Sequence, residues 1–529
     1  MKKILRLLRT VQYLKPIQVQ YRLYYMLRKQ WWKLTKFNFN WTPTPPVTRN
    51  LQMIDGITND RSYQSKHTFQ FLNLDQTFSG KINWNHAAYG KLWTYNLTYF
   101  EYLQQAEITA EEGRYLIEDF IASIASMKDG IEPFPTSLRI INWVKFLVKN
   151  QLQDAKINQS LYAQVQSLLA QLEYHLLGNH LLENGFALFI AGFYFEDAKI
   201  LAKAETILRA ELNEQILEDG AHFELTPMYH QLMLYRLLDC INLVQQNPGL
   251  IKKEWEQELR KKAQLMLGWM HKISFNGLQA MPLLNDSTLG IAPSAEALDT
   301  YAKALALTMQ PVELGESGYR KFKNENYEIL VDIGAIGPTY IPGHAHSDSL
   351  NFVLYAKDQA IIVDPGISTY EKNQQRTLER SSAYHNSVSI AGQDSSEVWG
   401  GFRVGRRAKI AALVERDKTE ITATHNGYRY LGAQHQRSFH FSDRTITITD
   451  KVFGKKISDT CAFLHFSPEE KVKVEENKII GNFGEIYFST PVTLVLENYH
   501  FSVGFNKTQN ASKVIIGFTQ ELITTIQLK

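Results

Sequence analysis

Residues 343–392 read GHAHSDSLNFVLYAKDQAIIVDPGISTYEKNQQRTLERSSAYHNSVSIAG, a series of short apolar runs separated by polar and turn-forming residues. Three of these runs are rich in β-branched and aromatic residues, which favour strands, and they lie at 349–356, 360–366 and 386–392. Strands that follow one another at short intervals, without helices between them, pair in antiparallel sheets. This stretch therefore predicts an antiparallel β-domain.

The same pattern continues on both sides of this stretch, in the segments 327–335, 419–427, 444–454 and 513–519. The turn pair Asn426 and Gly427 is typical of a connection between two adjacent strands. So many short strands predict an antiparallel β-sandwich over residues 321–529.

Upstream, the period of the apolar residues changes to that of a helix, in the segments 159–177, 204–217, 229–246 and 254–273. The connections between these segments are short, which favours antiparallel helical hairpins. We therefore expect a helical domain over residues 91–320, so that the fold class is α followed by β.

The first 90 residues are predicted to form a basic helical or irregular segment that packs on the body. The chain begins MKKILRLLRTVQYL, but Arg6, Arg9 and Lys15 interrupt the apolar region, and no small-residue cleavage site of a signal peptide follows. An anionic membrane surface or an acidic glycan is the alternative partner of this segment. No apolar run reaches the length of a transmembrane helix.

Composition restricts the class of ligand. The 57 basic and 54 acidic residues leave a net charge of +3, which gives no argument for nucleic acid. An acidic ligand must therefore be held by a local cluster of donors. The two cysteines, Cys240 and Cys461, lie far apart and are predicted to be free buried thiols.

The opening stretch also contains candidate metal ligands. His344 and His346 are two residues apart, so on an extended segment their side chains point the same way. Asp364 ends one predicted strand and His385 precedes another, which lets neighbouring strands bring His346, Asp364 and His385 together. Two imidazoles and a carboxylate suit zinc.

Polar clusters also interrupt the helical half. Asn179, His180 and Glu183 open an apolar run, where they are either helix-capping residues or donors that face a ligand. Tyr229 follows a proline typical of a helix start, and a tyrosine can donate a proton to a leaving oxygen. Arg139 can hold a carboxylate with two hydrogen bonds.

Several motifs in this order resemble the heparinase II/III family of polysaccharide lyases, namely GNHLLENG, DGAHFELTPMYH, GHAHSDSLNF, VDPG, RSSAYHNSV and FRVGRR. The resemblance extends from about Trp93 to Arg407, and more loosely to the end of the chain. It implies an incomplete (α/α) toroid followed by an antiparallel β-sandwich. It also implies β-elimination in a uronate-containing glycan, either heparan-sulfate-like or a bacterial exopolysaccharide.

The resemblance assigns roles to the residues that match the family's motifs. Four of them match catalytic positions: Asn179 and His180 would neutralise the uronate carboxylate, and Tyr229 and His344 would move protons. Three match a zinc site that is usually structural: His346, Asp364 and His385. Four are expected to contact substrate: Arg139, Glu183, Trp399 and Arg403, of which the last two form a basic aromatic lip whose alternative is a solvated surface.

Two other functions remain open from the sequence. A glycoside hydrolase needs two carboxylates beside the scissile bond, for which Glu183, Glu224 and Asp348 are available. A glycan-binding or assembly protein without turnover is the other alternative. The family suggests the periplasm or cell envelope and the N-terminus suggests the cytoplasm; the oligomeric state is not predicted.

Overall fold

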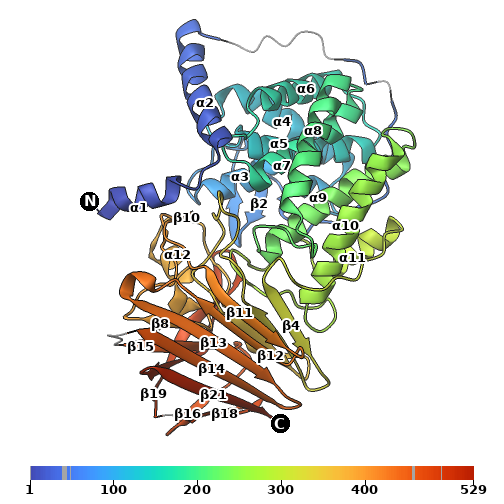
Figure 1. Ribbon diagram of the computed structural model, residues 1–529. Helices are drawn as coiled ribbons and strands as arrows, with labels where there is room; N and C mark the ends of the chain where they lie inside the picture. Colours follow the sequence, from blue (N-terminus) through green and yellow to red (C-terminus); the bar gives the residue numbers. More distant parts are fainter. Residues whose placement is uncertain (1, 38–44, 48, 455–458, 490) are drawn as a thin grey trace.

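The computed structural model describes the whole chain except residues 1, 38–44, 48, 455–458 and 490. Helices make up one half of the molecule and strands the other, and the chain passes from the first to the second in sequence order (Figure 1). This confirms the predicted order of a helical toroid followed by a β-sandwich.

The N-terminal region begins with two helices, α1 (Lys2–Val11) and α2 (Pro16–Thr35), and continues into a small antiparallel sheet of β1 (Tyr63–Ser65), β2 (Thr68–Phe71) and β3 (Leu74–Thr77). The prediction of a helical or irregular segment did not include this sheet. Phe71 of β2 packs edge-on against Trp93 in the helical body. The sheet is therefore part of the core of the helical half.

The helical body contains α3 (Lys91–Tyr99), α4 (Ala110–Ser123), α5 (Pro133–Lys149), α6 (Ala155–Ala170), α7 (Gly178–Tyr194), α8 (Ala198–Gln215), α9 (Pro227–Gln246), α10 (Lys253–Ile273) and α11 (Ala295–Ala304). Local sequence explains several starts: Asp154, Asp197 and Ser294 accept hydrogen bonds from the first turns of α6, α8 and α11, and Pro133 and Pro227 open α5 and α9.

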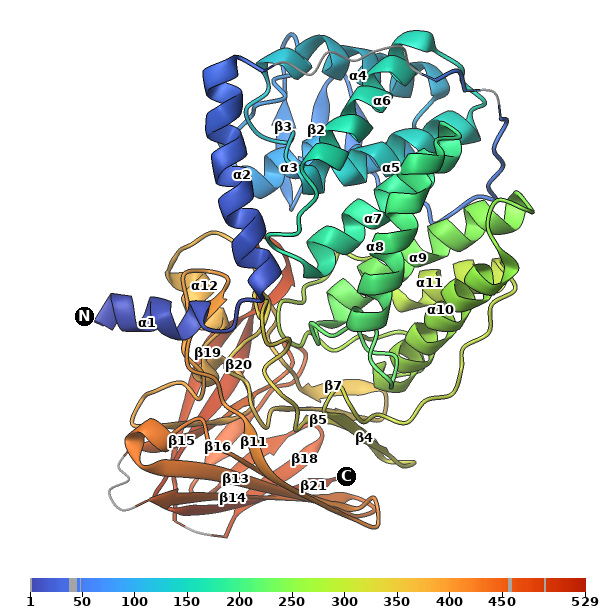
Figure 2. The same ribbon diagram turned by 45° about the horizontal axis from the view of Figure 1, so that its top comes forward.

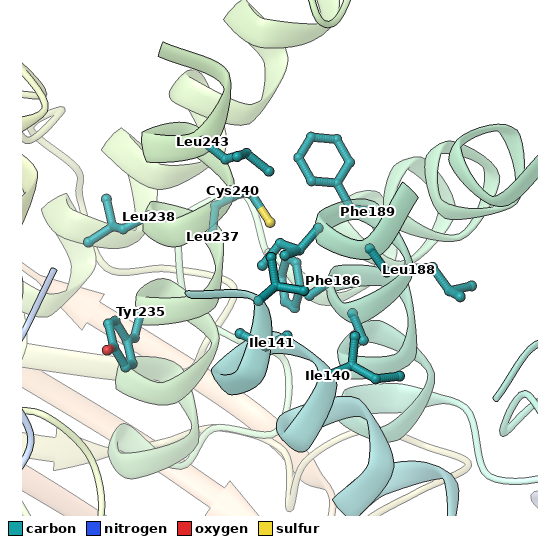
Figure 3. Packing of buried hydrophobic residues seen from close by; sticks show 14 of the residues in the cluster. Ile140, Ile141, Phe186, Leu188, Phe189, Tyr235, Leu237, Leu238, Cys240 and Leu243 are labelled. Atoms are coloured by element: carbon teal, nitrogen blue, oxygen red, sulfur yellow. The ribbon is translucent and has the colours of Figure 1, made fainter. Parts of the chain in front are cut away.

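The core of this body lies between α5, α7 and α9 (Figure 3). Ile140, Phe186 and Phe189 contribute side chains with at most 1% exposure. Cys240 is buried in the same cluster as a free thiol, as predicted, whereas the other free thiol, Cys461, is only half-buried.

One predicted helix is shorter than its apolar pattern. The pattern extends over 159–177, but α6 ends at Ala170 and α7 begins at Gly178. Leu172 and Leu177 remain buried because the turn between the two helices also packs on the core. Leu177 and Gly178 adopt φ angles of 63° and 59°, so the helical path of α6 cannot continue directly into α7.

The β half is built from three antiparallel sheets that enclose a second core. One sheet contains β4 (Tyr319–Lys323), β5 (Tyr327–Asp332), β6 (Phe352–Ala356) and β7 (Gln359–Ile362). The largest has the order β11 (Ile410–Arg416), β12 (Glu420–His425), β13 (Ala433–Phe441), β14 (Thr445–Gly454), β21 (Glu521–Leu528), β18 (Gly484–Phe488), β17 (Lys478–Gly481) and β16 (Lys473–Glu475).

The third sheet has the order β19 (Thr493–Gly504), β20 (Lys507–Phe518), β15 (Thr460–His465) and β8 (Val388–Ile390). A hairpin of β9 (Val398–Trp399) and β10 (Arg403–Val404) and a short helix, α12 (Gln374–Glu379), lie between these strands in sequence. The predicted domain boundary at 320–321 falls within β4, just after the connection that leads from α11 to the first sheet.

Candidate active site

Tyr229 of the helical half and His344 of the β half are in contact. Tyr229 lies in the first turn of α9, and His344 lies in the loop between β5 and β6. Their rings are stacked, with centroids 3.9 Å apart and planes 16° apart. The structure therefore places side by side the two residues for which proton-transfer roles were predicted.

Glu224 orients the imidazole of His344. Nδ1 of His344 donates to Oε2 of Glu224 over 2.5 Å. Burial raises the pKa of Glu224, but His344 and two further histidines, His222 and His180, together outweigh that effect and hold the pKa below its usual value. The ionised carboxylate accepts from Nδ1, so that in the neutral form of the imidazole the lone pair is on Nε2. Sequence reasoning had noted Glu224, five residues before Tyr229, but had not given it this role.

The hydroxyl group of Tyr229 lies 3.2 Å from that of Tyr370. Burial raises the pKa of Tyr229 above its usual value, and the hydrogen bond to Tyr370 offsets this only in part. Tyr229 is therefore protonated at neutral pH and is suited to donate a proton. Tyr370 follows the VDPG motif in sequence and was missed, because nothing in its surroundings distinguishes it from a core tyrosine.

Asn179 and His180 lie in the first turn of α7. Nδ1 of His180 is 3.0 Å from Oε1 of Glu173, and the side chain of His180 is 34% exposed. Burial lowers the pKa of His180, but the carboxylates of Glu173, Glu224 and Glu183 together outweigh this effect, so that the pKa is raised and the charged form is favoured. Asn179 is 2% exposed. This turn therefore offers the imidazole of His180 to an anionic group, whereas the amide of Asn179 is almost as buried as Glu183.

A glycine brings this turn close to Glu224. A Cβ atom placed on Gly178 would lie 3.4 Å from Oε1 of Glu224 and 3.3 Å from the side chain of Ile341. The φ angle of Gly178, 59°, is also one that other residues rarely adopt. The start of α7 therefore lies close to the carboxylate that holds His344.

Glu183 lies one turn further into α7 and is bound by another residue of the protein. It is 1% exposed, and its Oε1 accepts a hydrogen bond from Nε of Arg236 over 2.9 Å. Arg236 in turn donates to Glu101 over 2.7 Å. Glu183 therefore lies beneath the site. It has no exposed atom with which to make the predicted contact with substrate.

Arg139 is also buried, contrary to the expectation that it contacts substrate. It is 1% exposed and donates to the side chains of Gln164 and Thr136 and to the carbonyl groups of Thr98 and Gly130. Burial lowers its pKa to about 9. Arg139 therefore fastens α5 to its neighbours, and its donors are directed into the protein.

We expect Arg139→Met to lower the free energy of unfolding by about 2–4 kcal/mol, because it leaves several buried acceptors without a donor. KM for a glycan substrate should stay unchanged. Denaturant unfolding and steady-state kinetics measure the two effects, with the exposed Arg416→Met as the control. A stable Arg139→Met protein with a raised KM would instead support direct contact with substrate.

Trp399 and Arg403 face each other across the β9–β10 hairpin, with the guanidinium 4.8 Å from the indole centroid. Nε1 of Trp399 donates to Thr10 of α1 over 3.1 Å, while Arg403 is exposed. Phe402, in the turn of the hairpin, lies edge-on to His344 with ring centroids 6.2 Å apart. The hairpin thus borders the site, and its contact with α1 was not predicted.

The predicted zinc ligands are close to one another. Nδ1 of His346 is 3.2 Å from Nε2 of His385, near the roughly 3.3 Å expected for two nitrogens on one tetrahedral zinc ion. Asp364 accepts from the other nitrogen of His385 over 2.8 Å. No group of three or more His, Cys, Asp or Glu side chains among the described residues is placed to hold a metal ion. The nitrogens of the two predicted histidine ligands are therefore close together, whereas Asp364, predicted as the third ligand, is bound to His385 instead.

Comparison with known protein families identifies the chain. Residues 135–307 match the heparinase II/III N-terminus, and residues 308–528 match the heparinase II/III-like C-terminal domain. The chain therefore belongs to the heparinase II/III family, as its motifs predicted.

Individual relatives are distant. A heparin-sulfate lyase of Bacteroides stercoris is 24% identical over 314 residues, which span 54% of this chain and 45% of that protein, so the match covers less than half of the relative's length. A crystal structure of heparinase III superposes with a TM-score of 0.69 at 14% identity, covering 98% of this chain and 93% of the other. A mutant heparan sulfate lyase of Pedobacter heparinus gives 0.56 at 17% identity, covering 87% and 81%. These structures share the fold.

Proposed function

We propose that the protein is a polysaccharide lyase that cuts uronate-containing acidic glycans, heparan-sulfate-like or bacterial exopolysaccharide, by β-elimination. The observation that carries this proposal is the stacked pair of Tyr229 and His344, in which a carboxylate orients the imidazole. The pair combines a protonated phenol with an imidazole whose outer nitrogen can accept a proton.

The reaction first requires that the uronate carboxylate be neutralised. The C5 proton is a weak acid while the neighbouring carboxylate keeps its full charge, so donors must stabilise the enolate-like intermediate. His180, whose raised pKa favours the charged form, supplies the cationic donor, and the amide of Asn179, which is buried in the structure without substrate, is proposed as the second donor.

Proton transfer then follows from the orientation of the two rings. Nε2 of His344 takes the C5 proton, the electron pair of the C5–H bond forms the double bond between C4 and C5, and the bond from C4 to its oxygen breaks. The hydroxyl of Tyr229 protonates the departing oxygen. One proton has then been gained by His344 and one lost by Tyr229, and solvent restores both.

The carboxylates that a glycoside hydrolase would use are engaged elsewhere. Glu183 is bound by Arg236 and Glu224 by His344, while Asp348 is 3% exposed. Inverting and retaining hydrolysis both need two carboxyl groups that flank the scissile bond. This arrangement favours elimination over hydrolysis.

The test is an incubation of the purified protein with heparan sulfate, heparin, chondroitin, hyaluronan, alginate and a bacterial exopolysaccharide, followed by ultraviolet absorbance. Elimination conjugates the new double bond with the carboxylate, so absorbance should rise with at least one glycan. New reducing ends without absorbance would establish the hydrolase, and tight binding without any product would establish a glycan-binding protein.

The pH profile tests the role of His180. Activity needs the charged imidazole, so kcat/KM should fall as pH rises through the raised pKa of His180. Glu173→Gln removes the charge that raises this pKa, although Glu224 and Glu183 remain. The alkaline fall should therefore move to lower pH, while the exposed Glu118→Gln leaves it in place. An unchanged alkaline limb in Glu173→Gln would contradict this role.

We further propose that zinc binds to His346 and His385, with Asp364 orienting His385. The ion would be structural and would hold the loop that carries His344. Protein purified without chelators should contain about one zinc per chain by elemental analysis, and His346→Asn should lose it while the exposed His440→Asn retains it. Metal-free protein that keeps the same melting temperature would contradict the proposal.

We also propose that the protein works in the periplasm or at the cell envelope, where such glycans are found. The proposal rests on the family and the substrate class. Fractionation of the native cells and detection of the protein with an antibody tests it, and recovery only with the cytoplasmic fraction would contradict it.

A further inference from the structure

We propose that α1 and α2 together form a docking surface for an anionic lipid membrane. Both helices lie at the edge of the molecule, and α1 extends away from the body (Figures 1 and 2). The proposal rests on which face of each helix contacts the protein, which face is exposed, and the sign of the charges.

Helix α1 is attached to the body by its polar face. Arg6 and Arg9 both bind the carboxylate of Glu397, and Thr10 accepts the hydrogen bond of Trp399. The apolar side chains point outward with the i, i+3, i+4, i+7 spacing of one helical stripe: Ile4 is 65% exposed, Leu7 46%, Leu8 57% and Val11 41%. A helix that packs on a soluble protein body normally buries this apolar stripe against it.

Helix α2 repeats this arrangement. On its inner face, the side chains of Gln18, Arg22, Tyr25 and Arg28 donate to the carbonyl groups of Leu176, His175, Leu172 and Ala170. The outer face carries apolar residues again, namely Val19 at 44% exposure, Leu23 at 53%, Met26 at 54%, Leu27 at 65% and Leu34 at 81%. Each of the two helices therefore presents a row of unburied apolar side chains.

The charges select an anionic partner. Residues 3–36 contain nine Lys and Arg residues and no Asp or Glu. Five of them bind groups of the body, and the other four, Lys3, Lys29, Lys33 and Lys36, are left for an anionic partner. Apolar side chains beside basic ones are the pattern of a helix that lies in the interface of an anionic membrane. Trp31, 64% exposed at the outer end of α2, suits the headgroup region. No helix of the described residues is long and apolar enough to span a membrane, which leaves surface attachment.

This surface lies next to the candidate active site. The β9–β10 hairpin, whose Trp399 donates to Thr10 of α1, also carries Phe402, which packs edge-on against His344. Membrane attachment through α1 would therefore hold the site near the lipid surface, where a membrane-anchored or newly exported glycan is within reach.

The experiment uses the full chain and sedimentation with vesicles of phosphatidylcholine, either alone or with phosphatidylglycerol. The triple variant Leu8→Gln, Leu23→Gln, Leu27→Gln removes exposed apolar groups and should not disturb the core. A matched control replaces exposed apolar residues of the sandwich: Leu413→Gln, Val414→Gln and Leu496→Gln, which are 40%, 48% and 45% exposed.

We expect the native chain to bind the anionic vesicles at low salt, to bind neutral vesicles weakly and to be released by salt. The triple variant should bind at least about tenfold more weakly, and the control variant as well as the native chain. Lyase activity on soluble glycan should be equal in all three, which separates this proposal from the proposed function.

Several results would overturn the proposal. Equal binding to neutral and anionic vesicles, no binding to either, or unchanged binding by the triple variant would each exclude an anionic lipid surface. A concentration-dependent dimer that the triple variant abolishes would identify a second copy of the chain as the occupant. Retention on an acidic polysaccharide that the same variant weakens would identify a glycan.

Discussion

Tyr229→Phe is expected to lower kcat by about 1,000-fold and to change KM by less than about threefold. The substitution removes only the hydroxyl that protonates the departing oxygen. The ring remains, so its stacking on His344 and the position of a bound glycan are retained. Steady-state ultraviolet kinetics measure both parameters.

The matched control is Tyr370→Phe, which removes the hydroxyl 3.2 Å from that of Tyr229. This loss should lower kcat by only about tenfold, because Tyr370 positions the acid and does not transfer the proton. Equal losses in the two variants would contradict the assignment of Tyr229 as the proton donor, and so would a fully active Tyr229→Phe enzyme.

His344→Ala is expected to lower kcat by about 1,000-fold or more, because it removes the base that takes the C5 proton. Glu224→Gln keeps the imidazole but removes the charge that fixes the proton on Nδ1, so we expect a smaller loss of about 100-fold. Single-turnover measurements on one defined oligosaccharide compare the rate of elimination in the two variants directly.

The exposed His440→Ala serves as the control for the loss of a histidine elsewhere in the β half. It should retain native activity. If added imidazole restores activity to His344→Ala and not to Tyr229→Phe, the base is located at residue 344. A His344→Ala enzyme with native kcat would show that Tyr229 performs both proton transfers.

The fold was predictable where one period dominates a long segment. The pattern at 229–246 lies within α9, and that at 444–454 matches β14 to within one residue. The sheet of β1, β2 and β3 was missed because each strand has only three or four residues and little alternation. Such strands form because Phe69 and Phe71 find partners in the helical body.

The site was predicted from motifs, so the prediction did not include the residues outside those motifs that position the catalytic side chains. Glu173 raises the pKa of His180 from a turn outside any helix, where sequence periodicity gives no signal. Arg139 was expected to be accessible, because arginine usually is. The mainly apolar sequence of residues 138–147 in α5, broken only by Arg139, Asn142 and Lys145, was the indication that this arginine is buried.

The central claim, that the chain cleaves by elimination, is tested most directly by mass spectrometry of the products formed in oxygen-18-labelled water. Elimination transfers no oxygen from solvent to the fragments. We therefore predict products whose masses, after allowance for exchange of the reducing-end oxygen with solvent, add up to that of the intact glycan. The added mass of one whole water per cut would show hydrolysis and would contradict the account.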